Sequence, residues 1–218
     1  MSSAELFGCV GTAEGMWARF ASHWDDLAPD RYAEELGTQR LRRYGRFLFT
    51  PASAEFRLLP HDAFAQPEAS NPLYVDRDRH FMPLTDAFAA DPMLQRLLDF
   101  LGPAATALED ADRWSATVTP FRVLAHADRG GDPTPEGVHR DGVTLVTSLL
   151  VGRDNAVGGE SSVYHADGGR LLTTTLSEPG AMLLGDDRCT LHGVSPIRAL
   201  DPARPARRDV LVITFAPA

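Results

Sequence analysis

Hydrophobic residues near the start of the chain recur at the spacing of an amphipathic helix. Within residues 13–27 the apolar side chains stand three and four positions apart, at Met16, Phe20, Trp24 and Leu27. Because an α-helix turns once in about 3.6 residues, this spacing places them on one face. The pattern therefore predicts a helix whose aromatic face packs into the core rather than serving as a binding platform.

Residues 91–108 repeat the helical pattern and also carry start signals. The apolar positions are Met93, Leu94, Leu97, Leu98 and Leu101. Asp91 can cap the first turn with its carboxylate, and Pro92 suits the first helical position, where its missing N–H needs no partner. We therefore expect a second helix that begins after Asp91.

The region between these helices predicts shorter elements. Residues 40–50 place several arginines ahead of Phe47, Leu48 and Phe49, and we expect the end of this segment to form a strand. Four prolines then interrupt the chain, at Pro51, Pro60, Pro67 and Pro72. Proline lacks a backbone N–H, so short strands and loops are expected there.

After Trp114 the pattern becomes one of β-branched and aromatic runs separated by Gly, Pro and Asp. The predicted strands are residues 114–127, 143–151, 161–165, 170–176, 181–184 and 209–215. Several strands without intervening helices favour an antiparallel sandwich or barrel over a parallel sheet. We expect one domain over residues 1–218 that is mainly β with flanking helices. Residues 1–113 would be mostly helical and supporting, and residues 114–218 would form the β core.

Composition excludes several classes of partner. The 218 residues are 44% hydrophobic and 23% charged, the balance of a globular protein, and the net charge is −9. An acidic chain lacks the basic face that nucleic acid requires. Its apolar runs are far shorter than the roughly 20 residues that span a bilayer, and residues 1–10 lack the positive start of a secretory signal. We expect a cytoplasmic protein without nucleic-acid or membrane partners, whose oligomeric state the sequence does not reveal.

The two cysteines predict neither a disulfide framework nor a zinc site. Cys9 and Cys189 lie far apart in the sequence, and neither belongs to a C-x-x-C pair. Both are interpreted as small packing residues.

The candidate chemistry lies in residues 135–142, whose sequence is PEGVHRDG, directly before a predicted strand. In an extended segment, residues two apart project from the same face, so the side chains of His139 and Asp141 would point together into the interior. His192 follows another short strand and could lie opposite them in a sandwich. Two imidazoles and one carboxylate leave open positions on a metal ion and suit non-haem iron(II).

Each part of this pattern has a simpler alternative. His and Asp stand two apart by chance in many chains, and a lone histidine such as His192 is usually satisfied within a loop. Many non-haem iron(II) enzymes use the co-substrate 2-oxoglutarate. A cationic side chain that could hold its distal carboxylate would be an independent sign of non-haem iron(II) chemistry. Arg208 can supply it, because a guanidinium pairs with a carboxylate through two parallel hydrogen bonds. We expect Arg208 to point inward and Arg207 outward, although both could form a solvated end of the strand.

Several further motifs, in one order along most of the chain, accompany these residues. They are residues 42–46 (RRYGR), 135–142, 153–155 (RDN), 158–160 (GGE), 178–180 (EPG), 186–188 (DDR), 191–194 (LHGV) and 208–215 (RDVLVITF). Together they resemble the 2-oxoglutarate- and iron(II)-dependent dioxygenases that hydroxylate free amino acids, the L-isoleucine hydroxylase-like group. The resemblance implies a double-stranded β-helix (a cupin-like jelly-roll), His139, Asp141 and His192 as metal ligands, and Arg208 as the anchor for 2-oxoglutarate.

The implied reaction consumes O2 and 2-oxoglutarate, releases succinate and CO2, and oxidises a small molecule such as an amino acid. Candidate groups for the carboxylate and ammonium of such a substrate are Arg122, Glu136, Asn155 and Glu160. Arg122 is flanked by apolar residues and would need a carboxylate partner if buried. Two alternatives stay open, a cupin-type metal-binding protein without oxygenase activity and an interaction module without a metal.

Overall fold

The computed structural model describes residues 1–63 and 79–218. The helices of these residues are α1 (Ser3–Val10), α2 (Met16–Ser22), the 3-10 helix η1 (His23–Asp26), α3 (Arg31–Glu35), α4 (Asp86–Ala89) and α5 (Pro92–Leu108). The prediction of α5 is confirmed, and the Asp91 carboxylate accepts a hydrogen bond from the backbone N–H of Met93 at 2.8 Å. The predicted helix at residues 13–27 is shorter than expected and tightens into η1 after Ser22. Helices α1, α3 and α4 were not predicted.

Strands make up most of the remaining described chain. They are β1 (Ala28–Pro29), β2 (Gln39–Arg42), β3 (Gly45–Thr50), β4 (Glu55–Leu58), β5 (Trp114–Ala125), β6 (Leu145–Asp154), β7 (Ala156–Gly158), β8 (Glu160–His165), β9 (Arg170–Thr175), β10 (Met182–Asp186), β11 (Thr190–Val194), β12 (Ile197–Ala199) and β13 (Ala206–Pro217). The main sheet has the order β1-β2-β5-β13-β6-β10, with β3 and β4 joined through β5, and a smaller sheet has the order β11-β8-β9. All of these pairings are antiparallel.

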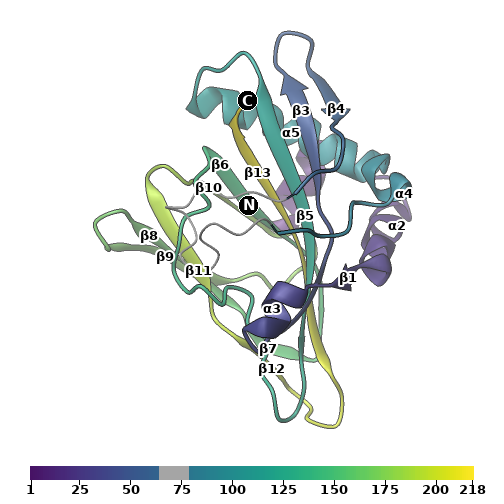
Figure 1. Ribbon diagram of the computed structural model, residues 1–218, viewed down its shortest axis with the longest axis vertical. Helices are drawn as coiled ribbons and strands as arrows, with labels where there is room; N and C mark the ends of the chain where they lie inside the picture. Colours follow the sequence, from purple (N-terminus) through teal and green to yellow (C-terminus); the bar gives the residue numbers. More distant parts are fainter. Residues whose placement is uncertain (64–78) are drawn as a thin grey trace.

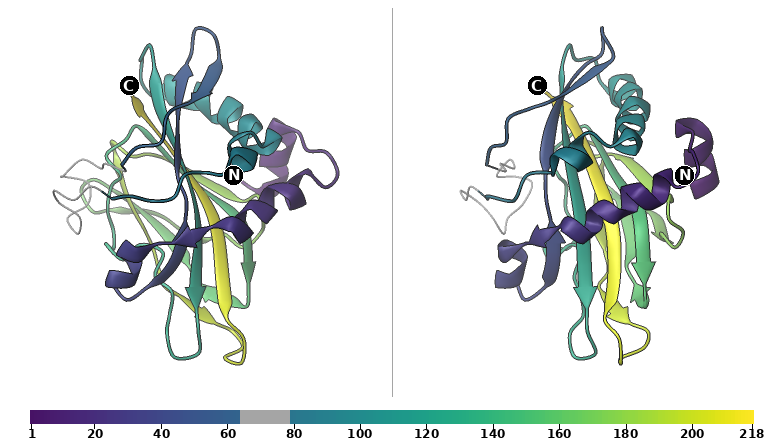
Figure 2. Two further views of the ribbon diagram at one scale, coloured as in Figure 1. Left: turned by 45° about the vertical axis from the view of Figure 1, so that its right-hand side comes forward. Right: turned by 90° about the vertical axis from the view of Figure 1, so that its right-hand side faces the viewer.

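The main sheet has one face toward the helices and one toward the small sheet (Figures 1 and 2). On β13, Leu211, Ile213 and Phe215 pack with α5 and α2 in the largest hydrophobic core. The alternate residues of β13, from Arg208 to Ala216, line a cavity on the other face. Successive side chains of a strand point to opposite faces of the sheet, so β13 contributes one set of residues to the hydrophobic core and the other set to the cavity.

The first half of the chain contributes strands as well as helices. β2 and β3 pair with β5, so residues long before Trp114 complete the main sheet. Trp24 is fully buried, and its indole N–H donates to the backbone carbonyl of Phe121 on β5 at 2.9 Å. The prediction that the aromatic face with Phe20 and Trp24 packs into the core is therefore confirmed. The hydrogen bond of Trp24 also fixes η1 against the sheet.

Some local predictions were wrong. The strand expected over residues 143–151 is β6, which begins two residues later, at Leu145. His139 and Asp141 precede it as expected, but their segment is irregular and not the extended one assumed for their common direction. Cys9 and Cys189 are exposed rather than packed. Pro67 and Pro72 fall outside the described residues, and within the described residues no helix has the length and apolar character needed to cross a membrane.

Candidate metal centre

A reciprocal pair of backbone hydrogen bonds brings the two histidines side by side. The N–H of His139 donates to the carbonyl of His192, and the N–H of His192 donates to the carbonyl of His139, both at 2.9 Å. In an antiparallel bridge of this kind the two side chains project from the same face. His192 lies on β11, and segment 137–139 lies directly beside it. The ring centroids are consequently 4.6 Å apart.

Small residues permit this close approach. A Cβ on Gly193 would lie 3.2 Å from Val138 Cγ2 and 3.3 Å from the carbonyl oxygen of Gly137. Gly137 itself has a φ of 78°, a left-handed conformation that glycine adopts without strain. Thr134 adds a side-chain clamp, since its hydroxyl accepts from the N–H of Val194 and donates to its carbonyl, each at 3.0 Å.

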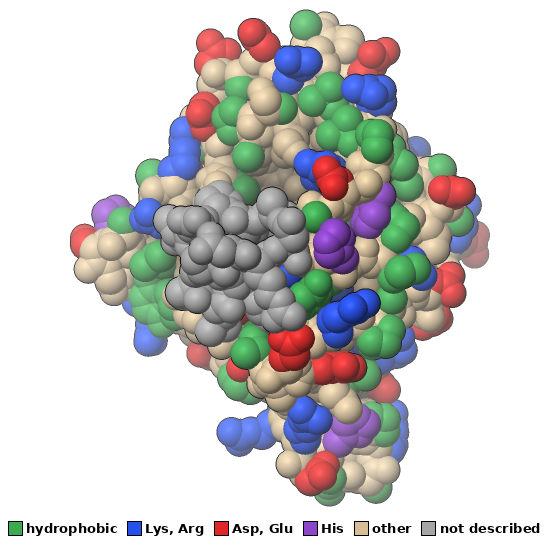
Figure 3. Space-filling model, in the orientation of Figure 1, with side chains coloured by type: hydrophobic (Ala, Val, Ile, Leu, Met, Phe, Trp, Pro, Cys, Tyr) green, Lys and Arg blue, Asp and Glu red, His purple; other side chains and the backbone are tan. Residues whose placement is uncertain are grey.

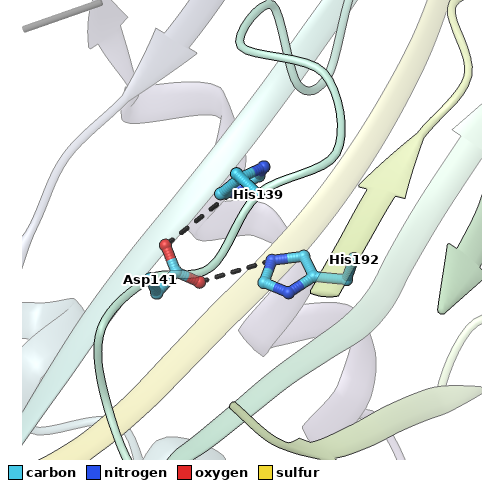
Figure 4. A group of neighbouring side chains, drawn as sticks. All are labelled: His139, Asp141 and His192. Carbon is cyan, nitrogen blue, oxygen red and sulfur yellow. Dashed lines mark ion pairs between the residues drawn. The ribbon is translucent and has the colours of Figure 1, made fainter. Parts of the chain in front are cut away.

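Asp141 completes a group of three donors (Figure 4). Its carboxylate lies 3.9 Å from His139 Nε2 and 3.4 Å from His192 Nε2. One ligand atom from each of the three residues lies within 4.8 Å of the others. Adjacent donors around an ion with bonds of about 2.1 Å are separated by about 3 Å, so small side-chain movements would complete coordination.

Hydrogen bonding prepares His139 for a metal. Its Nδ1 lies 2.9 Å from the carbonyl oxygen of Gly137, which can only accept, so Nδ1 carries the ring proton. Nε2 is then left with its lone pair directed toward Asp141 and His192. This is the tautomer that a metal-binding histidine requires.

The charges of the group interact strongly. Burial by itself raises the pKa of the Asp141 carboxyl, but the contacts and charges of His192 and His139 outweigh burial and lower this pKa below its usual value. Burial by itself lowers the pKa of the His192 imidazole, but the contact with Asp141 and the charges of Asp141 and Asp187 outweigh burial and raise this pKa above its usual value. Asp141 is therefore ionised at neutral pH, and its negative charge suits a ligand of a metal cation.

Arg208 is buried in the same cavity. Its side chain is 1% exposed, and among the described residues neither its Nε nor its Nη2 has a hydrogen-bond partner. The inward direction predicted for Arg208 is confirmed, because Arg208 is buried and lines the cavity whereas Arg207 is exposed. Burial and the neighbouring Arg153 lower the pKa of Arg208 to about 10, so its guanidinium is still charged at pH 7. A buried charge without a partner is a strong sign of an anionic ligand.

The cavity has a volume of about 360 Å³, within the range of small-molecule sites. His139, Asp141, His192 and Arg208 all line it. Its other walls combine hydroxyl and apolar side chains with further arginines: Ser115, Thr117, Thr119, Phe121, Val163, Val212, Arg40, Arg42, Arg46 and Arg79. Figure 3 shows histidine side chains beside acidic and arginine side chains on this face of the molecule.

Only one of the four residues considered for the substrate reaches this cavity. Glu136 lines it, and its Oε1 lies 3.5 Å from His139 Nε2. Arg122 has the carboxylate partner that its burial required, but the partner belongs to the protein: Asp209 accepts two hydrogen bonds at 2.7 and 2.8 Å, and Asp25 lies at 3.3 Å. The structure therefore does not place Arg122 at the site.

Asn155 and Glu160 have local structural contacts instead. The Asn155 amide donates to the carbonyls of Asp201 and Arg204 and accepts from the N–H of Asp201, which binds it to the loop before β13. Glu160 is exposed, and its backbone N–H donates to the Ser195 hydroxyl. Both contacts depend on segments some forty residues away, so no local pattern indicates them.

Two buried residues of the site were not considered from the sequence. Ser161 lines the cavity with a buried hydroxyl that has no hydrogen-bond partner among the described residues. Asp187 contacts both the segment after Asp141 and the ring of His192. Neighbouring Asp186 has the same side chain and binds Arg188 instead, so residue type alone did not distinguish them.

Comparison with known proteins decides the family. Residues 21–214 match the 2OG-Fe dioxygenase family, which is most of the chain. The chain belongs to this family. The dioxygenase accordingly uses Fe(II), 2-oxoglutarate and O2, as the resemblance of its motifs implied.

Individual relatives agree with this family. L-isoleucine-4-hydroxylase of Bacillus thuringiensis is 24% identical over 195 residues, which cover 88% of this dioxygenase and 79% of the hydroxylase. A BsmA homologue from Methylobium petroleophilum PM1 superposes with a TM-score of 0.89 at 34% identity, covering 100% of this chain and 87% of the homologue. The crystal structure of IDO from Bacillus thuringiensis superposes with a TM-score of 0.79 at 19% identity, covering 97% and 87%. The predicted mainly β, jelly-roll fold is confirmed.

Proposed function

We propose that this dioxygenase hydroxylates a free L-amino acid or a closely related small molecule, with release of succinate and CO2. The observation that carries the proposal is a cavity in which a His-Asp-His group and a buried, unpartnered arginine occur together. The His-Asp-His group fits a metal ion that keeps coordination positions open for other ligands, and the arginine fits a carboxylate.

In this proposal His139, Asp141 and His192 hold iron(II). The donor set fits, because His139 is already in the required tautomer and the ligand atoms converge within 4.8 Å. Bound iron and 2-oxoglutarate supply the activation of oxygen and the oxidation of a substrate C–H bond. The residues of the chain hold the ion, orient the two organic molecules and keep water from the reaction.

Arg208 would bind the distal carboxylate of 2-oxoglutarate. Its burial means that the pair would form away from bulk water, where a charge-assisted hydrogen bond is stronger. Gly159 allows Arg208 to take this position, since a Cβ there would lie 3.1 Å from Arg208 Cδ. Ser161 offers a further hydrogen-bonding group in the same cavity.

The amino-acid substrate is supported by the distribution of charge in the cavity. Glu136 can bind an ammonium group close to the metal, and the guanidinium groups on the cavity wall suit a carboxylate. The apolar side chains of Phe121, Val163 and Val212 suit an aliphatic substituent. The likeness to L-isoleucine-4-hydroxylase, whose name describes such a reaction, supports the same class. Glu136 is retained as a substrate residue, whereas Arg122, Asn155 and Glu160 are not.

The proposal is tested by incubating the protein with Fe(II), ascorbate, 2-oxoglutarate and a panel of free amino acids. We expect succinate to form together with a product heavier by one oxygen, measured by mass spectrometry. His139→Ala, Asp141→Ala and His192→Ala should each abolish both products while the apoprotein stays folded. Glu136→Gln should raise the KM for the amino acid by about 10- to 100-fold and leave the KM for the keto acid unchanged, because it removes a charge-assisted hydrogen bond.

His165→Ala is the matched control, since His165 is exposed and pairs with Asp167 away from the cavity. Unchanged turnover in the three ligand variants would refute the assigned metal site. Succinate formation without oxidation of any amino acid in the panel would refute the substrate class and leave the metal site standing.

A further inference from the structure

Asp187 connects the two parts of the metal centre. It follows β10, and its side chain is 0% exposed. Its Oδ2 accepts hydrogen bonds from the backbone N–H groups of Gly142 at 2.7 Å and Val143 at 3.1 Å. Its own backbone N–H donates to the carbonyl of Thr144 at 3.0 Å. The turn that follows Asp141 is thus held by one buried residue.

The second carboxylate oxygen of Asp187 faces a metal-binding histidine. Oδ1 lies 3.6 Å from Nδ1 of His192, whose other ring nitrogen faces Asp141. Both Oδ1 and Nδ1 are buried, and neither has a hydrogen-bond partner among the described residues. Buried polar atoms are normally hydrogen-bonded, so the acceptor Oδ1 and the potential donor Nδ1 are natural partners. A shift of a few tenths of an ångström would bring them to hydrogen-bond length.

We infer that Asp187 is a positioning residue that accepts the Nδ1–H of His192 and so leaves Nε2 free for the metal. The inference rests on the metal site proposed above. His139 obtains the same tautomer from a neutral group, the carbonyl of Gly137. A carboxylate in this role also makes the imidazole a better electron donor to a metal, and the loss of such a partner commonly weakens metal binding by about 10- to 100-fold.

Asp187→Asn separates this role from the support of the turn. The amide oxygen must stay on the two N–H groups of Gly142 and Val143, which need an acceptor. The amide NH2 then faces Nδ1 and requires it to be an acceptor, which moves the ring proton to Nε2, the atom that should bind the metal. The variant therefore keeps the turn and opposes the required tautomer.

The decisive measurement is the dissociation constant of Fe(II), determined anaerobically for the full-length protein without any turnover. We expect Asp187→Asn to weaken Fe(II) binding by about 10- to 100-fold, with a Tm of the apoprotein close to that of the wild type. Asp186→Asn is the matched control and should bind Fe(II) normally, because the Asp186 carboxylate binds Arg188 outside the cavity. Wild-type affinity in Asp187→Asn would overturn the inference.

A second measurement uses the wild-type protein alone and so does not depend on how the variant folds. In the Zn(II)-loaded form, NMR should show a His192 Nδ1–H signal that is protected from exchange with solvent. Metal bound at Nδ1, or rapid exchange of that proton, would overturn the inference. If His192→Ala bound Fe(II) as tightly as the wild type, the proposed metal site itself would fail, whereas an effect of His192→Ala without an effect of Asp187→Asn would refute only the role of Asp187.

Discussion

Arg208 illustrates, at the residue scale, how a binding group can lower the stability of a fold. Its guanidinium is removed from water, and two of its nitrogen atoms have no hydrogen-bond partner within the described residues. Desolvation of such a charge is unfavourable by several kcal/mol unless a partner compensates it. The proposed partner is 2-oxoglutarate, which would make Arg208 unfavourable for folding and favourable for binding.

Arg208→Met should therefore separate these two effects. We expect the free energy of unfolding of the apoprotein to stay the same or rise by about 1–4 kcal/mol, because an apolar side chain replaces an uncompensated charge. The KM for the keto acid should rise by at least about 30-fold, the equivalent of about 2 kcal/mol for a lost buried charge pair. Urea denaturation and succinate kinetics measure the two quantities. Arg207→Met, at the exposed neighbouring position, should change neither, and an unaltered KM in Arg208→Met would exclude the anchor role.

At the scale of elements, the site depends on the contact between β11 and segment 137–139. No regular strand carries His139, yet two backbone hydrogen bonds fix it opposite His192. Thr134 holds the same segment to the end of β11, and Asp187 holds the turn that follows it. The distance between the two imidazoles is thus set by how closely these two stretches of backbone approach.

Gly193→Ala tests this dependence. The added Cβ would press on Val138 and on the carbonyl of Gly137 at 3.2–3.3 Å, and this backbone must move by a few tenths of an ångström. Because misplacement of about 1 Å can reduce catalysis about 100-fold, we expect a fall of about 3- to 10-fold in kcat/KM and weaker Fe(II) binding. Gly152→Ala is the control, since Gly152 lies on β6 and the added Cβ would have no atom within 4 Å apart from those of its own residue and its two chain neighbours. Equal kinetics of the two variants would show that this contact does not set the site geometry.

At the scale of the whole molecule, the core that stabilises the fold and the cavity that binds ligands lie on opposite faces of one sheet. The largest hydrophobic cluster joins α2 and α5 to the inner residues of β5, β6 and β13. The metal-binding group lies on the other face, where the small sheet approaches. The fold should therefore not depend on the metal for its core.

Removal of the metal tests this separation. We expect chelation to leave the far-UV circular dichroism spectrum unchanged, because His139, Asp141 and His192 do not belong to the helix-side hydrophobic cluster. With Fe(II) at about 100 times its Kd, the metal would contribute about 2.7 kcal/mol, so its removal should lower the Tm by about 5–10 °C. Global unfolding on chelation, as in small zinc-dependent domains, would contradict this arrangement.

The sequence by itself determined the properties that depend on local periodicity and on residue chemistry. The three- and four-residue spacing identified α5 and the region of α2, and β-branched and aromatic runs separated by Gly, Pro and Asp identified most strands of the second half of the chain. The two-residue period also predicted that Arg207 and Arg208 point to opposite faces, as they do, but it did not by itself say which of them points inward. Periodicity gives the face of a residue, because the backbone geometry of helices and strands is the same in every protein.

Only the tertiary structure decided which groups meet. Arg122 needed a carboxylate, and the register of β13 on β5 supplied Asp209 directly opposite it. Asp187 rather than Asp186 faces His192 because the turn between β10 and β11 directs one carboxylate inward and the other toward Arg188. Such partners are far apart in the sequence or alike in type, and their choice depends on strand register and backbone approach, which no local pattern encodes.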